Sequence, residues 1–99
     1  MTKRVVFTAG AREDLRRITE YIAADSPKRA RSFVAELRSR LEAKLSDFPA
    51  SGPSIGNYRY SVFGQYVAIY RDHEKLDSIR VVMVTEGHRD WRRMIEDLI

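Results

Sequence analysis

Apolar residues recur every three or four positions through the first half of the chain, the spacing of one helical face. A first helix, capped by Thr8, places on this face Ala11, Leu15, Ile18 and Ile22. Asp25-Ser26-Pro27 ends it and starts another, because Ser is a favoured N-cap and Pro fits the first helical position. The second helix, expected to end at Phe48-Pro49, has an apolar face of Ala30, Phe33, Val34, Leu37, Leu41 and Leu45. So short a break predicts an antiparallel helical hairpin whose inner faces are core.

The second half contains short runs that alternate between apolar and polar residues or are continuously apolar, as β-strands do. Strands are expected at residues 57–63, 66–71 and 79–86, and a further short strand at residues 4–7. Gly64-Gln65 is the expected turn, and residues 50–56 and 72–77 are expected loops. A last short helix, with Asp90 as its N-cap, would place on one face Trp91, Met94, Ile95 and Leu98.

The resulting order, β-α-α-β-β-β-α, predicts an α+β fold. The N-terminal helical hairpin is expected to pack on one face of a small antiparallel β-sheet, a two-layer arrangement. The first strand is expected to pair with a strand of the C-terminal meander. The length of 99 residues fits one domain over residues 1–99.

The positive charge lies in the helical half. Residues 1–48 carry 11 Lys and Arg against 7 Asp and Glu, whereas residues 49–99 carry 7 against 7, giving the net charge of +4. Such a surplus suits nucleic acid or an acidic protein partner, and the alternative is a solvated basic surface.

Cysteine is absent, which excludes disulfides, thiolate metal sites and thiol nucleophiles. The first residues lack the long apolar region of a signal peptide, and no stretch approaches transmembrane length. We therefore expect a cytoplasmic protein that does not act at a membrane.

Candidate chemistry is concentrated in cations of the second half: Arg59, Arg71, His88, Arg89, Arg92 and Arg93. Arg binds phosphate or carboxylate through its planar fork of donors, and His can act as acid or base near neutrality. Strand alternation could bring Arg59 and Arg71 to the same sheet surface. The alternative is a set of surface cations with a capping His.

Two further features have simpler interpretations. Asp72-His73-Glu74 resembles a metal-ligand cluster, but without a second ligand motif a solvated turn is the better interpretation, so no metal or cofactor is expected. The aromatic residues of the second half could stack on bases if exposed, but core or rim packing is expected of Tyr58, Tyr60, Tyr66, Tyr70 and Trp91. Trp91 could anchor the last helix or serve as an exposed anchor for a partner.

Several segments, in their order and spacing, resemble the RelE/ParE toxin superfamily, and the ParE branch most closely. They are Ala11-Arg-Glu-Asp-Leu15…Ile18…Tyr21-Ile22-Ala23, Ala30…Phe33-Val34…Leu37, Leu45…Phe48-Pro49…Gly52, Tyr66-Val…Ile69-Tyr70-Arg71 and Val81…Val84…Gly87-His88-Arg89-Asp90. The resemblance spans almost the whole chain.

This resemblance implies the toxin of a bacterial type II toxin–antitoxin module. The implied partner is a ParD-like antitoxin with a DNA-binding N-terminal part, whose C-terminal segment wraps the toxin and often fills the groove between helical hairpin and sheet. ParE-like toxins block DNA gyrase, whereas RelE-like toxins cleave mRNA on the ribosome.

The RelE-type set of functional groups is incomplete here. Arg89 matches one of its arginines and Arg59 stands at a lysine position, but Val67 replaces an arginine. The second lysine position falls near Ser61 and the tyrosine position at Ile95. Because one positioned acid or base contributes about 10²–10⁴-fold, robust mRNA cleavage is disfavoured.

Two alternatives stay open. His88 could substitute for a missing group, which leaves a ribonuclease set of Arg59, His88 and Arg89. The other is an inert homologue that only binds its antitoxin.

A gyrase inhibitor needs a complementary surface rather than catalytic residues, and a few anchors carry such a surface. The expected target-binding residues are Arg59, Arg71, His88, Arg89, Trp91, Arg92 and Arg93. The toxin alone is not expected to bind nucleic acid specifically.

Overall fold

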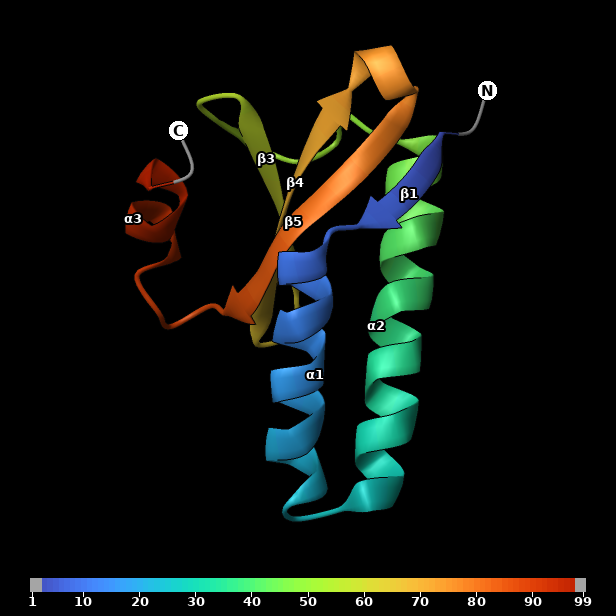
Figure 1. Ribbon diagram of the computed structural model, residues 1–99, viewed down its shortest axis with the longest axis vertical. Helices are drawn as coiled ribbons and strands as arrows, with labels where there is room; N and C mark the ends of the chain where they lie inside the picture. The colour runs from blue at the N-terminus through green and yellow to red at the C-terminus, as the bar shows by residue number, and fades with distance from the viewer. Residues whose placement is uncertain (1–2, 98–99) are drawn as a thin grey trace.

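The computed structural model describes residues 3–97 (Figure 1). Its elements are β1 (Arg4–Phe7), α1 (Ala9–Ala23), α2 (Pro27–Asp47), β2 (Ser54–Ile55), β3 (Tyr58–Phe63), β4 (Tyr66–His73), a 3-10 turn η1 (Glu74–Leu76), β5 (Ser78–Glu86) and α3 (Trp91–Glu96). The order β-α-α-β-β-β-α is confirmed, with two additions. β2 lies inside the expected loop 50–56, and β4 and η1 occupy most of the expected loop 72–77.

Both long helices begin where the capping residues predict. The hydroxyl of Thr8 accepts a hydrogen bond from the Ala11 N–H at 3.3 Å, and that of Ser26 accepts one from the Arg29 N–H at 3.2 Å. Pro27 stands in the first turn of α2. The expected apolar faces are buried at Ala11, Leu15, Ile18, Ala30, Leu37, Leu41 and Leu45, while Phe33 and Val34 are half-buried.

The sheet is mixed, which corrects the expected antiparallel arrangement. Its strand order is β1-β5-β4-β3-β2, and the pairs from β2 to β5 are antiparallel. β1 pairs with β5, a strand of the C-terminal meander, as expected. The pairing is parallel, however, with Arg4 opposite Ser78. Tight turns impose antiparallel pairing within the meander. No such turn joins β1 to β5, so local sequence does not set their direction.

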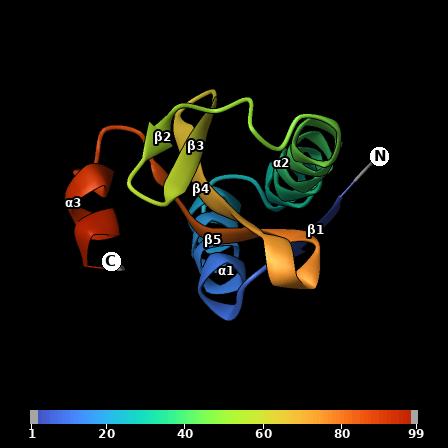
Figure 2. The ribbon, with the colours of Figure 1, turned by 90° about the horizontal axis from the view of Figure 1, so that it is seen from above.

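Helices cover both faces of the sheet, a third layer beyond the two expected (Figures 1 and 2). In β4, Ala68 and Tyr70 pack toward the helical hairpin, and Val67 and Ile69 pack toward α3. Burial on both faces explains why β4 is continuously apolar rather than alternating. We call the two sides the hairpin face and the α3 face.

A β-bulge adjusts which β5 residues meet the hairpin. Ile69 lies opposite Met83 and Tyr70 opposite Val81, so β5 has one extra residue there. Val81 and Val84, three positions apart, consequently both belong to the hairpin core. Since β1 ends opposite Val81, the Val84 N–H has no strand partner on that side, and the Asp14 carboxylate of α1 accepts it at 2.9 Å.

Candidate functional site

Arg59 is part of the framework of the hairpin face. It lies opposite Tyr70 in the β3–β4 pair and therefore shares the face of that buried tyrosine. Its Nη1 donates to the Gly52 carbonyl at 2.7 Å, and the Gly52 N–H donates to the Tyr70 hydroxyl at 3.0 Å. The expectation that Arg59 and Arg71 share a surface is wrong, because Arg71 follows Tyr70 and so faces the other way.

Trp91 anchors α3 to the sheet. It is only 5% exposed, and its ring lies 4.7 Å from that of Tyr60 between centroids. It shares a core cluster with Tyr58, Val67, Ile69 and Ile95. Of its two expected structural roles, the ring therefore has the packing one and is not an exposed anchor. Its expected part in target binding stays a prediction. Met94, also expected on the apolar face of α3, is half-buried, and Leu98 lies outside the described residues.

Asp90 occupies the N-cap position of α3 without making a side-chain capping hydrogen bond. Its carboxylate instead lies 3.8 Å from Arg93 Nε. Both side chains are more than two-thirds exposed, so this pair contributes little to stability.

Arg71 and Arg92 are brought together on the α3 face. The Arg71 guanidinium lies 5.9 Å from the centre of the Tyr58 ring. That of Arg92 lies 4.3 Å from the Trp91 ring and 5.6 Å from the Tyr60 ring. Tyr58 and Tyr60 are two residues apart on β3, hence on one face about 7 Å apart. Cation–π contacts thus orient two exposed arginines above the aromatic cluster.

His88 and Arg89 lie elsewhere, in the exposed turn after β5. Arg89 Nη1 is 3.7 Å from the Glu86 carboxylate, which is also 3.9 Å from Arg17 of α1. Glu86 lies opposite the first residue of β4, five positions before Arg71. At about 3.3 Å per residue, these groups are about 17 Å along the strand from Arg71. The expected cations therefore do not form one cluster.

The environment of Glu86 favours its charged form. Burial is the largest single influence and raises its pKa, but a backbone hydrogen bond, the charge of Arg17, the Thr85 hydroxyl and Arg89 together lower it further. The net effect holds the pKa of Glu86 below its ordinary value.

Asp72-His73-Glu74 is solvent-exposed at Asp72 and Glu74, as expected from sequence, but it is not a loop. Asp72 and His73 end β4, and Glu74 begins η1. Asp72 forms an ion pair with Lys3 at 2.7 Å, which joins the start of β1 to the sheet. Among residues 3–97, no three His, Asp or Glu side chains are arranged to hold a metal ion.

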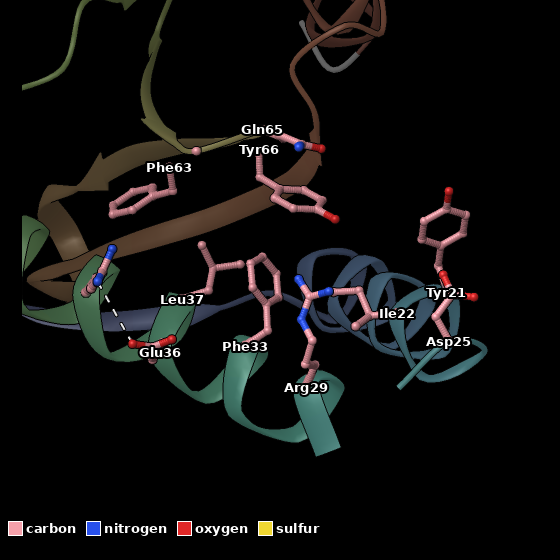
Figure 3. A pocket seen from close by; sticks show the side chains of 12 residues that line it. Tyr21, Ile22, Asp25, Arg29, Phe33, Glu36, Leu37, Phe63, Gln65 and Tyr66 are labelled. Atoms are coloured by element: carbon pink, nitrogen blue, oxygen red, sulfur yellow. Dashed lines mark ion pairs between the residues drawn. The ribbon is translucent and has the colours of Figure 1, made fainter. Parts of the chain in front are cut away.

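A groove of about 420 Å³ lies between the helical hairpin and the β3–β4 turn (Figure 3). We call it the hairpin groove. It is lined from α1 and its end by Tyr21, Ile22 and Asp25, from α2 by Arg29, Phe33, Glu36, Leu37 and Arg40, and from the strands and their turn by Phe63, Gly64, Gln65 and Tyr66.

The hairpin groove has an aromatic floor and a charged rim. The rings of Phe33 and Tyr66 meet at 5.2 Å between centroids, and Tyr21 stands 78% exposed at one side. Burial, with the neighbouring Glu86 charge, raises the pKa of Tyr66 above its ordinary value, so its hydroxyl stays protonated to higher pH. The rim carries charges of both signs, including an Arg40–Glu36 pair at 3.9 Å.

Sequence patterns did not single out these groove residues as a site. From sequence, Phe33 is predicted to be core because it continues the apolar stripe of α2. Its incomplete burial depends on how far α2 stands from the β3–β4 turn, which periodicity does not encode. An available signal was Tyr21, a large ring beside the buried stripe of α1.

Three positions at which the RelE-type functional groups are missing, Ser61, Val67 and Ile95, are buried. Ser61 is 3% exposed, and its hydroxyl accepts a hydrogen bond from Lys44 Nζ at 2.8 Å. Val67 is 3% exposed and Ile95 is fully buried. None of these three side chains can act as an acid or base on a substrate.

Fold and surfaces together define a class: a small α+β protein with a helical hairpin on a mixed sheet and a groove between the two. The described helices include none with the length and apolar character needed to cross a bilayer. The family model for the ParE toxin of the type II toxin–antitoxin system, parDE, matches residues 5–91. The chain therefore belongs to the ParE toxin family, as the sequence resemblance predicted.

Solved structures show the same fold. A chain of the chromosomal ParDE toxin–antitoxin system from P. aeruginosa superposes with a TM-score of 0.72 at 16% identity, over 86% of this chain and 96% of that one. A chain of the toxin–antitoxin complex RelBE2 from Mycobacterium tuberculosis superposes with a TM-score of 0.61 at 20% identity, over 87% and 99%. No curated protein sequence matches.

Proposed function

We propose that this ParE-family toxin inhibits DNA gyrase by protein–protein binding, without a catalytic step of its own, and that a cognate ParD-like, DNA-binding antitoxin neutralises it. The family match over residues 5–91 is the observation that carries the proposal. The geometry of the candidate residues supports binding over cleavage.

The ribonuclease alternative requires Arg59, His88 and Arg89 to act on one phosphodiester. Arg59 already donates to the Gly52 carbonyl on the hairpin face. His88 and Arg89 lie beyond the end of β5, and Arg89 is paired with Glu86. A general base must lie within hydrogen-bond reach of the proton it removes. Three groups so dispersed favour an inhibitor that acts by its surface.

For the gyrase contact, the best candidate surface is formed by Arg71, Arg92 and Arg93. Arg71 and Arg92 are held over aromatic rings, so they lose less side-chain freedom on binding than free surface arginines do. Arginine is among the residue types most enriched at binding hot spots.

For the antitoxin, the hairpin groove is the proposed docking site. An aromatic floor with a rim of both charge signs suits an amphipathic segment, with apolar side chains at helical spacing on the floor and polar ones at the rim. The neutral hydroxyl of Tyr66 offers a hydrogen bond to that segment without burying a charge.

Controlled expression in bacteria without an antitoxin tests the target. Gyrase inhibition predicts filamentation and the DNA-damage response while mRNA stays intact. Early arrest of translation with cut mRNA ends would contradict the proposal and establish the ribonuclease. Normal growth at high soluble expression would identify an inert antitoxin binder.

The groove is tested with Tyr21→Ala. Because this side chain is 78% exposed, its removal is expected to leave folding intact. The affinity for the antitoxin should fall about tenfold or more, the effect of losing an interface aromatic, while growth inhibition by the toxin alone persists. Arg31→Ala, on an exposed position of α2 outside the groove, is the matched control. Equal affinities for the two variants would remove the groove as the docking site.

A further inference from the structure

Three arginines gather on the α3 face without an acidic partner. Among residues 3–97, no ion pair includes Arg71, Arg80 or Arg92. Other arginines do have a carboxylate within 4.0 Å: Arg16, Arg17, Arg40, Arg89 and Arg93. Arginines elsewhere among the described residues also lie outside every ion pair: Arg4, Arg12, Arg29, Arg31, Arg38 and Arg59. What distinguishes Arg71, Arg80 and Arg92 is their common face, and we call these three the arginine triad.

The β4–β5 register places two members of the triad side by side. Arg71 lies directly opposite Arg80. Their chain neighbours Tyr70, Ile79 and Val81 pack into the hairpin core, so both arginines face the other side. Like charges at directly opposed sheet positions destabilise the fold. A bound anion between them would offset this repulsion.

Arg92 extends the triad along the sheet from α3. It lies over Tyr60, whereas Arg71 lies over Tyr58, and the two tyrosines are about 7 Å apart on β3. With β4 and β5 about 4.8 Å apart, the triad covers a patch about 10 Å across. Duplex DNA carries one charge per roughly 1.7 Å of its axis, so a patch of this size meets several phosphates.

The aromatic residues beneath the triad decide how nucleic acid could be contacted. Tyr58 is 9% and Trp91 5% exposed, and Arg92 covers the half-buried Tyr60. A base has no free ring on which to stack, which disfavours single strands. The three arginines are exposed or half-exposed residues, and guanidinium forks suit phosphate oxygens. Phosphate contacts carry no sequence information.

We propose that the α3 face binds the phosphate backbone of duplex DNA without sequence preference, through Arg71, Arg80 and Arg92. This goes beyond the proposed gyrase inhibition and does not depend on it. It adds to the sequence expectation, which concerned specific binding only.

The test is fluorescence anisotropy of a labelled duplex of about 20 base pairs, titrated with the full-length chain at several salt concentrations. Three phosphate contacts predict a slope of log K against log salt of about −2.7. Affinity should therefore weaken about 40-fold between about 50 and 200 mM salt. Arg71→Gln combined with Arg80→Gln should reduce the slope to about −0.9.

The matched control is Lys28→Gln combined with Arg31→Gln, which removes the same charge from exposed positions near the start of α2. It should retain nearly the full slope. A circular dichroism melt checks folding. The triad variant should melt close to the parent, because loss of the Arg71–Arg80 repulsion offsets loss of the Arg71–Tyr58 cation–π contact.

Equal slopes for the triad and control variants would overturn the proposal, as would the absence of salt-dependent binding. Tighter binding of single-stranded DNA than of duplex would overturn the choice of ligand. Competition by polyglutamate as effective as that by DNA, at equal charge, would instead assign the triad to an acidic peptide. The assay contains no gyrase, so its outcome is separable from that of the gyrase proposal.

Discussion

Replacing Gly52 with alanine should cost this protein a large part of its stability. Gly52 lies in the loop between α2 and β2, against Tyr60 of β3 and Tyr70 of β4. A Cβ at this position would stand 2.5 Å from the Tyr70 hydroxyl and closer still to the Tyr60 carbonyl oxygen, and real Cβ atoms essentially never approach within 3.0 Å. Tyr70 is fully buried and the second obstacle is backbone, so neither can move aside easily.

The loop must therefore shift, which disturbs two hydrogen bonds. These are the Gly52 N–H to the Tyr70 hydroxyl at 3.0 Å and Arg59 to the Gly52 carbonyl at 2.7 Å. Each is worth about 1 kcal/mol, and overpacking adds about 1–3 kcal/mol. We expect a loss of about 3 kcal/mol. For a domain of this size that corresponds to roughly 12–24 °C in Tm.

Urea and thermal unfolding measure this loss, and Gly10→Ala is the control. A Cβ at Gly10 meets Val82 O at an ordinary 3.6 Å, and alanine favours the helix by up to about 1 kcal/mol, so this variant should gain stability. Tyr70→Phe removes one of the two collisions, so Gly52→Ala should cost less in that background. A cost of Gly52→Ala below about 0.5 kcal/mol would refute the argument that the loop at Gly52 has no room for a Cβ. So would strict additivity of the free-energy changes caused by Gly52→Ala and Tyr70→Phe.

Three further predictions concern core, charge and surface. Leu41→Ala, at a fully buried position of α2, should lower the free energy of unfolding in urea by about 2–5 kcal/mol, and a smaller loss would show that the stripe is not core. Because the folded-state pKa of Glu86 is lowered, its stabilisation is present above its ordinary value of 4.5 and is lost as pH falls through the folded pKa. In the Glu86→Gln variant the free energy of unfolding should therefore fall less steeply as the pH is lowered below 4.5. An unchanged fall would speak against the Arg17 and Arg89 contacts. Arg92→Glu with Arg93→Glu should reduce growth inhibition at equal soluble expression, and undiminished inhibition would exclude that surface.

Local periodicity predicted the elements well because burial of one helix or strand face leaves a repeat in the sequence. The stripe ending at Leu45 and the caps Thr8 and Ser26 appear where expected. Non-local pairing was not predictable in this way. The parallel direction of β1 and the opposite faces of Arg59 and Arg71 depend on the register between strands, which no single segment encodes.

The candidate site was predicted only in part for the same reason. Arg71 and Arg92, two of the six candidate cations, lie on one face of the sheet, and Trp91 packs inward against that face. Arg80 escaped notice because it is one cation inside an apolar strand. It becomes a candidate binding residue only through its position opposite Arg71 in the β4–β5 pair.

The most direct test of the proposed function is supercoiling of relaxed plasmid by purified DNA gyrase, with the full-length chain titrated in. Gyrase inhibition predicts loss of supercoiling together with accumulation of linear, cleaved DNA, and reversal when the antitoxin is added. Unchanged supercoiling at large excess of a chain shown to be folded would contradict gyrase as the target.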